Sequence, residues 1–267
     1  MENTLEISNI SYRKKDEMAR NINTPPEILA ALAKDKYAKL IVAMNPNAPS
    51  EVLETLAEDE NIRVRMTVAE NEHTPSYILE KLSKDADFVV RCSVAKNKST
   101  PSHILAVLAN DKECVVCEKV ARNENTSAET LAELARSNYN SVRYTVVFNP
   151  NTTTDTLVLL AKDEDWEIRG GVACNEKTPV DILETLATDK EVCVRYDVAR
   201  NKKTPLSLLI SLANNEDAFV REGVATNKST PLGMLKSLSK DKDYCVRREA
   251  SKNLKEQKAN NKISEER

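Results

Sequence analysis

Residues 175–201 read NEKTPVDILETLATDKEVCVRYDVARN, and this stretch returns with small changes along nearly the whole chain. The asparagine at its start recurs at a constant interval of about 26 residues, and one shorter interval, from Asn21 to Asn45, precedes the series. The asparagines are Asn21, Asn45, Asn71, Asn97, Asn123, Asn149, Asn175, Asn201, Asn227 and Asn253. A fixed period of this size predicts a solenoid, in which each repeat buries its apolar face against its neighbours.

Each repeat begins with a predicted helix that carries two leucines. In the quoted copy these are Leu183 and Leu186, and the pair recurs in every copy at the same spacing. A spacing of three residues places both side chains on one helical face, which we expect to be buried. Thr178 is expected to cap the helix, and Pro179 to occupy its first position, where a missing N–H group costs nothing. Asp181, three residues after the threonine, would complete a capping box.

The second predicted element of the repeat is short and carries a stripe of valines. Val194 and Val198 stand four residues apart, as one face of a two-turn helix requires. A helix of this length is unstable alone, so neighbouring repeats must cover it. Asn201 is expected to end the element, because asparagine tolerates the left-handed conformation and hydrogen-bonds nearby backbone groups. The pattern therefore predicts an all-α repeat protein.

The unit N-x-x-T-P-x-x-L-x-x-L-A-x-D-x-x-x-x-V-R-x-x-V-A-x-N resembles the leucine-rich repeat variant family over about residues 9–253. The resemblance implies a right-handed α-solenoid, a superhelix of nine two-helix repeats of about 24–26 residues, in which the short second helix is partly 3₁₀. A founding member of that family carries an iron–sulfur cluster on an N-terminal group of cysteines. The first cysteine of this chain is Cys92, so we expect no such cofactor and no metal site.

The pattern divides the chain into three parts. Residues 1–20 are expected to form a polar N-terminal cap equivalent to half a repeat, and residues 21–253 the repeat array. Residues 254–267 lose the pattern and are nearly all polar, which predicts a disordered tail or a frayed helix. The first residues contain no apolar run suited to a signal peptide or a membrane span. Six cysteines that do not recur once per repeat favour reduced thiols and a cytoplasmic location.

The second element of most repeats contains an arginine six residues after an aspartate, which is similar to HEAT repeats. The arginines of this column are Arg65, Arg91, Arg143, Arg169, Arg195, Arg221 and Arg247; Arg143 and Arg221 follow Ser137 and Asn215 in place of the aspartate. Bidentate pairing with an aspartate of the same or an adjacent repeat would make this column a structural ladder. The alternative is a row of arginines that binds phosphates or an acidic peptide. Cys117 interrupts the column, which predicts that Asp111 lacks an arginine partner.

Irregular positions are expected to carry recognition, because the framework of a solenoid repeats while its binding surface varies. Aromatic residues and glycines gather in the second elements of the central repeats. They are Tyr144, Phe148, Trp166, Gly170, Gly171 and Tyr196. Aromatic anchors beside bare backbone would suit a peptide hot spot, whereas packing between repeats would explain the same residues without a ligand.

Charge and side-chain chemistry narrow the function. The formal net charge is −3, from 39 Lys plus Arg and 42 Asp plus Glu, which counts against bulk attraction to nucleic acid or anionic membranes. Cys114 and Cys117 form a lone CxxC; buried thiols are the simpler explanation, and a redox pair is the alternative. His73 and His103 have no recurring catalytic partner.

We therefore predict a protein without catalytic activity that binds a protein or peptide segment in the concave groove of the solenoid. The alternative is a nucleic-acid-binding solenoid of the DNA-glycosylase kind, although a matched set of acids and arginines disfavours it. The sequence sets neither the partner nor the oligomeric state.

Overall fold

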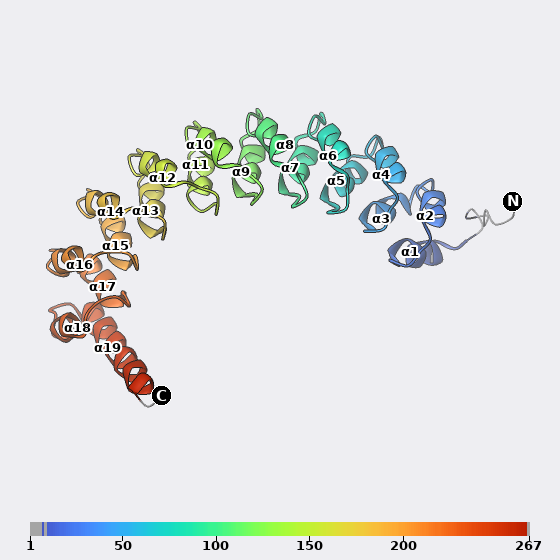
Figure 1. Ribbon diagram of the computed structural model, residues 1–267. Helices are drawn as coiled ribbons and strands as arrows, with labels where there is room; N and C mark the ends of the chain where they lie inside the picture. The colour runs from blue at the N-terminus through green and yellow to red at the C-terminus, as the bar shows by residue number, and fades with distance from the viewer. Residues whose placement is uncertain (1–6, 8–9, 266–267) are drawn as a thin grey trace. The chain divides into compact units, whose positions relative to one another are not determined.

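The computed structural model describes residue 7 and residues 10–265, with side chains through residue 259. Within that part every element of regular secondary structure is helical. Helix α1 (Tyr12–Arg20) precedes nine helix pairs (Figure 1). The first helices of the pairs are α2 (Pro26–Leu32), α4 (Ser50–Leu56), α6 (Ser76–Leu82), α8 (Ser102–Leu108), α10 (Ala128–Leu134), α12 (Thr154–Leu160), α14 (Val180–Leu186), α16 (Leu206–Ala213) and α18 (Leu232–Leu238). The second helices are α3 (Lys39–Met44), α5 (Ile62–Glu70), α7 (Phe88–Lys96), α9 (Cys114–Arg122), α11 (Asn140–Val147), α13 (Trp166–Cys174), α15 (Val192–Arg200), α17 (Ala218–Thr226) and α19 (Tyr244–Glu265).

Proline decides where most of the first helices begin. Before α14, Pro179 is the N-cap residue in an extended conformation, with φ −63° and ψ 154°, and the helix starts one residue later than predicted. The Thr178 hydroxyl donates to the Val172 carbonyl at 2.6 Å, at the open C-terminal end of α13. The predicted threonine cap is therefore wrong, and so is the capping box with Asp181. The last carbonyls of a helix have no partner inside it, so they compete for a nearby hydroxyl.

The second helices, expected to be the short element, are mostly the longer ones. Six of them span 9 residues, whereas the first helices span 7 or 8. All of them are α-helical, and none contains a 3₁₀ segment in the described residues. Side-chain caps help to start several of them, as where the Asp165 carboxylate accepts from the Glu167 N–H at 2.9 Å.

The core of each repeat lies between its two helices. Leu183 and Leu186 of α14, and Val194 and Val198 of α15, are almost completely buried. Burying side chains of this size contributes about 1.5–3 kcal/mol each. The predicted apolar face of each helix is confirmed.

The periodic asparagine links neighbouring repeats. The Asn201 side-chain amide donates to the Ala173 carbonyl at 2.6 Å and the Asn175 carbonyl at 3.1 Å, both in the preceding repeat. Its Oδ1 accepts from the Lys203 N–H at 2.9 Å. The backbone of Asn201 is extended, with φ −63°, so the expected left-handed conformation is wrong. Asparagine is needed here because one amide both donates across the junction and accepts within the turn.

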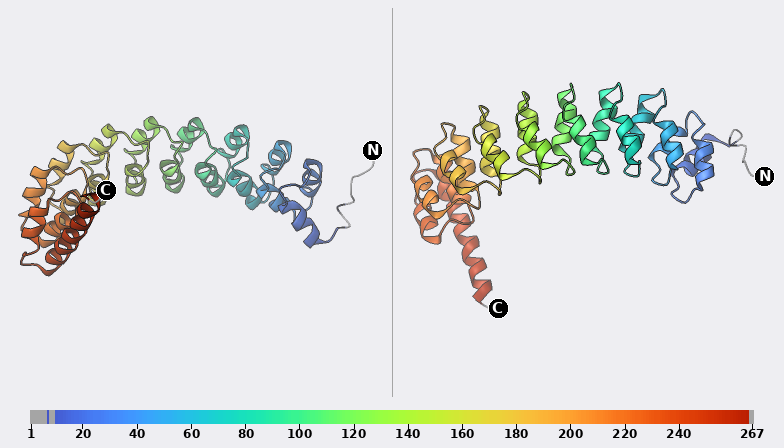
Figure 2. Two further views of the ribbon diagram at one scale, coloured as in Figure 1. Left: turned by 60° about the horizontal axis from the view of Figure 1, so that its bottom comes forward. Right: turned by 45° about the horizontal axis from the view of Figure 1, so that its top comes forward.

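Two compact units make up the chain: residues 1–134 with 149–151, and residues 135–148 with 152–267. Inside each unit, every second helix packs against the next second helix, and no comparable contact joins successive first helices of the described part. The second helices therefore form the inner row of each unit, and the first helices the outer row (Figures 1 and 2).

The C-terminal helix α19 runs through residue 265, so the predicted boundary between array and tail falls inside it. Its packing partners within the second unit are α17 and α18. Among the described residues, no helix combines the length and apolar character needed to cross a bilayer.

Candidate partner-binding face

The arginine column forms a ladder between adjacent repeats. Arg169 donates from Nε to Asp189 Oδ2 at 2.6 Å and from Nη2 to Asp189 Oδ1 at 2.9 Å. Its Nη1 donates to the backbone carbonyl of Asp163, the aspartate of its own repeat, at 2.8 Å. We call each such arginine–aspartate pair a rung. The complete rungs are Arg65–Asp85, Arg91–Asp111, Arg143–Asp163, Arg169–Asp189 and Arg221–Asp241.

Two expectations about the ladder need correction. Asp111 is not left unpaired, because the arginine that binds it is Arg91, in the preceding repeat. Lysines that the sequence reasoning missed extend the ladder: Lys15 pairs with Asp35 and Lys39 with Asp59. Lys39 precedes Arg65 by the same interval that separates Arg65 from Arg91, so counting would have found it.

The interruption at Cys117 preserves a hydrogen bond without a charge. The Cys117 thiol lies 3.4 Å from the Asp111 carbonyl oxygen, the backbone group that an arginine Nη1 contacts in the rungs. Burial raises the pKa of this thiol, which disfavours the reactive thiolate. Ser137 stands where the aspartate that pairs with residue 117 would be. This rung therefore has an uncharged residue at both its arginine position and its aspartate position. All six cysteines carry free thiols, and Cys114 is half-buried.

Ionisation of the ladder favours a structural role. Hydrogen bonds from Arg221 hold the pKa of Asp241 below its ordinary value, against the opposing effect of burial. The same pairing raises the pKa of Arg221. Both groups therefore stay charged and engaged with each other, and their bidentate geometry leaves little of the guanidinium for an outside phosphate.

Two ladder arginines have no carboxylate partner among the described residues: Arg195 and Arg247. Arg195 keeps the backbone anchors, donating from Nη1 to the Asp189 carbonyl at 2.7 Å and the Lys190 carbonyl at 3.1 Å. Arg247 donates in the same way to the Asp241 and Lys242 carbonyls, at 2.7 and 2.8 Å. The Arg247 guanidinium also lies 5.9 Å from the centre of the Tyr244 ring.

The predicted aromatic cluster separates into small groups, all within the second unit. On α11, the Tyr144 ring meets the Phe148 ring edge to face, with centroids 5.1 Å apart. A methyl group added at Gly171 would lie 3.2 Å from the end of the Phe148 ring, so this glycine admits the phenylalanine from the adjacent second helix. Close approach is therefore the reason for the glycine, and Gly171 itself is buried.

A second aromatic group includes a residue that the sequence reasoning missed. Tyr196 of α15 stacks on Phe219 of α17, with ring centroids 3.8 Å apart and planes 9° apart. The Arg200 guanidinium lies 5.4 Å from the centre of the Tyr196 ring. A methyl group at Gly223 would lie 3.0 Å from Tyr196, so this glycine also makes room for a ring. Tyr196 and Phe219 have the same separation in sequence as Phe148 and Gly171, and both contacts join one second helix to the next.

The remaining residues of the cluster lie around α13. Trp166, the first residue of that helix, is 42% exposed and stacks on no other ring of the described chain. Gly170 is buried, and a methyl group there would lie 2.8 Å from Asp197 Oδ2. Burial raises the pKa of Asp197, although the nearby Cys174 thiol acts to lower it. Cys174 is exposed as a whole, but desolvation of its thiol, together with Asp197, raises the pKa of that thiol to about 12.

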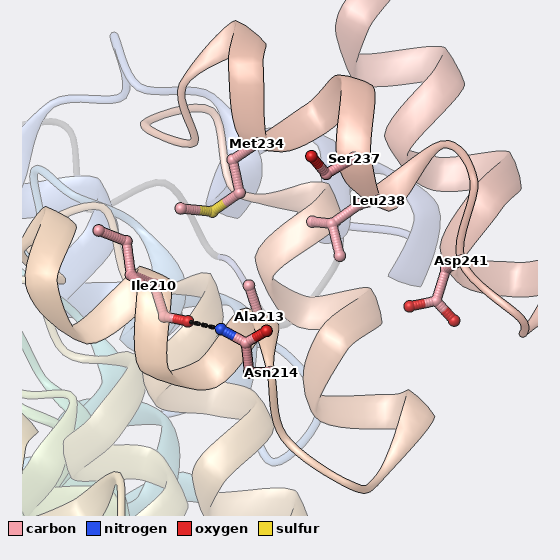
Figure 3. A pocket seen from close by; sticks show the side chains of 7 residues that line it. All are labelled: Ile210, Ala213, Asn214, Met234, Ser237, Leu238 and Asp241. Atoms are coloured by element: carbon pink, nitrogen blue, oxygen red, sulfur yellow. Dashed lines mark hydrogen bonds between the residues drawn. The ribbon is translucent and has the colours of Figure 1, made fainter.

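A hollow of about 350 Å³ lies on the outer row of the second unit, between α16 and α18. Figure 3 shows the Ile210, Asn214 and Met234 side chains around it, with the Asn214 amide bonded to the Ile210 carbonyl at 2.8 Å. Its charged group, Asp241, is already held in a rung by Arg221. The described residues contain no group of three or more His, Cys, Asp or Glu side chains arranged to hold a metal ion.

The fold of this chain matches a solved structure. It is similar to a structure described as a leucine-rich repeat variant with a novel repetitive protein structural motif, with TM-score 0.63 and 21% identity over 93% of this chain and 98% of that chain. A weaker likeness, with TM-score 0.44 and 19% identity, covers 84% of this chain and 97% of YIBA_ECOLI. No protein-family model and no curated protein sequence matches the chain. At this identity the first structure establishes the leucine-rich repeat variant fold, an α-solenoid, as the sequence pattern predicted.

Proposed function

We propose that this protein is a non-catalytic scaffold that binds an extended protein segment along the second helices of its second unit. The carrying observation is the set of exposed aromatic side chains on α11 and α13. Tyr144 is 43%, Phe148 51% and Trp166 42% exposed. Large aromatic groups that stay in water in the free protein are typical of binding hot spots.

The scaffold beneath these side chains supports the proposal. Rungs and asparagine bonds link each second helix to its neighbours, so the aromatic residues are held on rigid elements. An aromatic ring fixed by only two side-chain torsions loses little entropy on binding. Gly170 and Gly171 contribute indirectly, since each makes room for a side chain of an adjacent helix.

A protein segment fits this face better than nucleic acid does. The complete rungs use their guanidinium groups on carboxylates, and the chain carries a formal net charge of −3. Duplex binding needs many cationic groups free to meet phosphates. A cytoplasmic location remains part of the proposal.

The test uses peptides selected for binding from a random display library. Their affinities are then measured by calorimetry for the wild-type protein and for Tyr144→Ala combined with Tyr196→Ala. We expect a loss of about 10-fold or more, because each truncated anchor is worth on the order of 1–2 kcal/mol. Equal affinity for both proteins would contradict the proposal.

The matched control is Tyr37→Ala combined with Tyr77→Ala. Both tyrosines are exposed, and both lie in the first unit, away from the proposed face. The control should bind the selected peptides as the wild type does. Thermal unfolding of both double variants separates a lost contact from a damaged fold.

A further inference from the structure

One rung in the middle of the second unit lacks its acid. Asn215 follows Arg195 at the interval that separates arginine from aspartate in a complete rung. The Arg195 guanidinium is nevertheless held by the same backbone anchors as the paired arginines. Because those anchors fix the plane of the guanidinium, its Nε and Nη2 edge is presented as in a complete rung, with no carboxylate to receive it. We call Arg195 and Asn215 the open rung.

The orientation of the Asn215 amide follows from the one side-chain hydrogen bond that it makes within the described part of the chain. The Asp217 N–H donates to Asn215 Oδ1 at 3.0 Å. In the complete rungs the equivalent N–H also donates to an aspartate Oδ1, as Asp243 does to Asp241 at 2.8 Å. The Asn215 NH₂ group therefore occupies the place of Oδ2, the atom that accepts from arginine Nε in the complete rungs. The open rung thus turns donors toward donors.

A site lined only by donors calls for an acceptor. Arg195 and Asn215 both keep partial exposure, so a ligand can reach them. Two nearby acids are engaged elsewhere: Asp189 pairs with Arg169, and Asp217 accepts from the Phe219 N–H at 2.8 Å. A charge-assisted hydrogen bond to an outside anion would relieve the unmet donors.

We infer that the open rung binds a carboxylate, supplied by an Asp or Glu side chain of the bound protein segment. Five aspartates of this chain already lie against a ladder arginine, so the ladder itself selects a planar, bidentate carboxylate. Tyr196 follows Arg195 directly in α15 and stacks on Phe219. The acidic residue would therefore bind one position away from an aromatic anchor along α15. The assignment of the carboxylate to a bound protein segment rests on the proposed function. The anion site at Arg195 and Asn215 does not depend on it.

The first experiment observes the site directly with sodium acetate. The Nε–H signal of Arg195 in the ¹⁵N-labelled protein, identified by its loss in Arg195→Lys, is followed during titration against sodium chloride of equal ionic strength. We expect a saturable shift of this signal and none for Arg169. The closing control is Asn215→Asp, which supplies the missing acid and should abolish the response. A response that persists in Asn215→Asp, or no response in the wild type, would overturn the inference.

Inorganic phosphate in the same titration separates the anion classes. A signal that responds to phosphate and not to acetate would replace the carboxylate with a phosphate and overturn the inference. For the side chain, N-acetylated and C-amidated Trp-Glu is compared with Trp-Gln. We expect about 10-fold tighter binding of Trp-Glu to the wild type, and no preference in Asn215→Asp. Equal binding of the two dipeptides to the wild type would overturn the assignment to a Glu side chain.

Failure of the proposed function has a different outcome. If the selected peptides ignore the aromatic face while acetate still shifts the Arg195 signal, the segment-binding proposal fails and the anion site stands. Acetate needs no aromatic anchor, so Tyr144→Ala should respond to it as the wild type does.

Discussion

The second helices of the two units share a framework and differ in the residues that occupy two variable columns. In the second helices of the first unit, the position after the ladder residue is occupied by Leu40, Met66, Cys92 and Glu118, and the position four residues later by Met44, Glu70, Lys96 and Arg122. In the second unit the same two positions hold Tyr144, Gly170, Tyr196, Glu222 and Arg248, then Phe148, Cys174, Arg200, Thr226 and Lys252. Three of the ten residues in the second unit are aromatic, and none of the eight in the first unit is. The framework residues and these variable residues therefore occupy different columns of one repeat, so a solenoid can change its surface without changing its fold.

If the two units share one framework, replacing the periodic asparagine should lower the free energy of unfolding by the same amount in each. Asn97→Ala in the first unit and Asn201→Ala in the second each remove a buried amide that donates to two carbonyls. Leaving buried acceptors unsatisfied lowers the free energy of unfolding by about 2–4 kcal/mol. Urea titration measures both variants.

The matched control is Asn125→Ala. Asn125 also donates to two carbonyls of the preceding repeat, at 2.6 and 3.1 Å, but it is exposed. Water replaces its bonds, so we expect a loss below about 1 kcal/mol. A large difference between Asn97→Ala and Asn201→Ala would break the claim of one framework.

The glycines of the second unit test whether its recognition columns are tightly packed. A methyl group at Gly223 would lie 2.9 Å from Ala199 Cβ and 3.0 Å from the Tyr196 carbonyl oxygen. Backbone cannot yield as a side chain can, so Gly223→Ala should lower the free energy of unfolding by about 1–3 kcal/mol. The comparison is Gly233→Ala in α18, where the added methyl group meets nothing within 4 Å. That variant should be more stable by up to about 1 kcal/mol, and loss of stability there would contradict the packing argument.

The rungs should contribute equally in both units, and only above acidic pH. The pKa of Asp241 is lowered by its hydrogen bonds from Arg221. Burial tends to raise the pKa of Asp111 in the first unit, but the hydrogen bond from Arg91 and other favourable contacts outweigh it, so this pKa is lowered too. A carboxyl group whose folded pKa is depressed stabilises the fold above its unfolded pKa of about 3.9. That contribution is lost as pH falls through the folded pKa.

Asp111→Asn and Asp241→Asn should therefore each lower the free energy of unfolding by about 1–2 kcal/mol at pH 7. The difference from wild type should shrink as pH falls below about 4. Thermal unfolding between pH 2 and 7 measures both variants. A difference that is independent of pH would mean that packing, and not ionisation, explains the loss. Each substitution also replaces the aspartate of a complete rung with asparagine, the residue found at position 215. Each variant therefore has a second open rung for comparison.

Much of the fold could be predicted because its signals are local. The period, the buried leucine and valine faces and the pairing of helices follow from spacing within one repeat. The predicted helix starts were less accurate. Thr178 could cap the helix that follows it or bond the helix before it, and only the position of the preceding helix selects the Val172 carbonyl. For the candidate site, the sequence identified Tyr144 and Tyr196 as irregular. It missed Phe219, because stacking depends on the register between neighbouring second helices.

By itself, the sequence determined a two-helix repeat, its length and its apolar core, since each depends on residues a few positions apart. The tertiary structure decided what each polar side chain reaches across a junction. Asn201 bonds backward to the preceding repeat, whereas Arg169 bonds forward to Asp189 in the next. The spacing of residues within one repeat does not specify how far apart neighbouring repeats lie. That distance determines which atoms these side chains reach. That distance also places Asn215, where other repeats have aspartate, opposite Arg195, so this arginine has no acid partner.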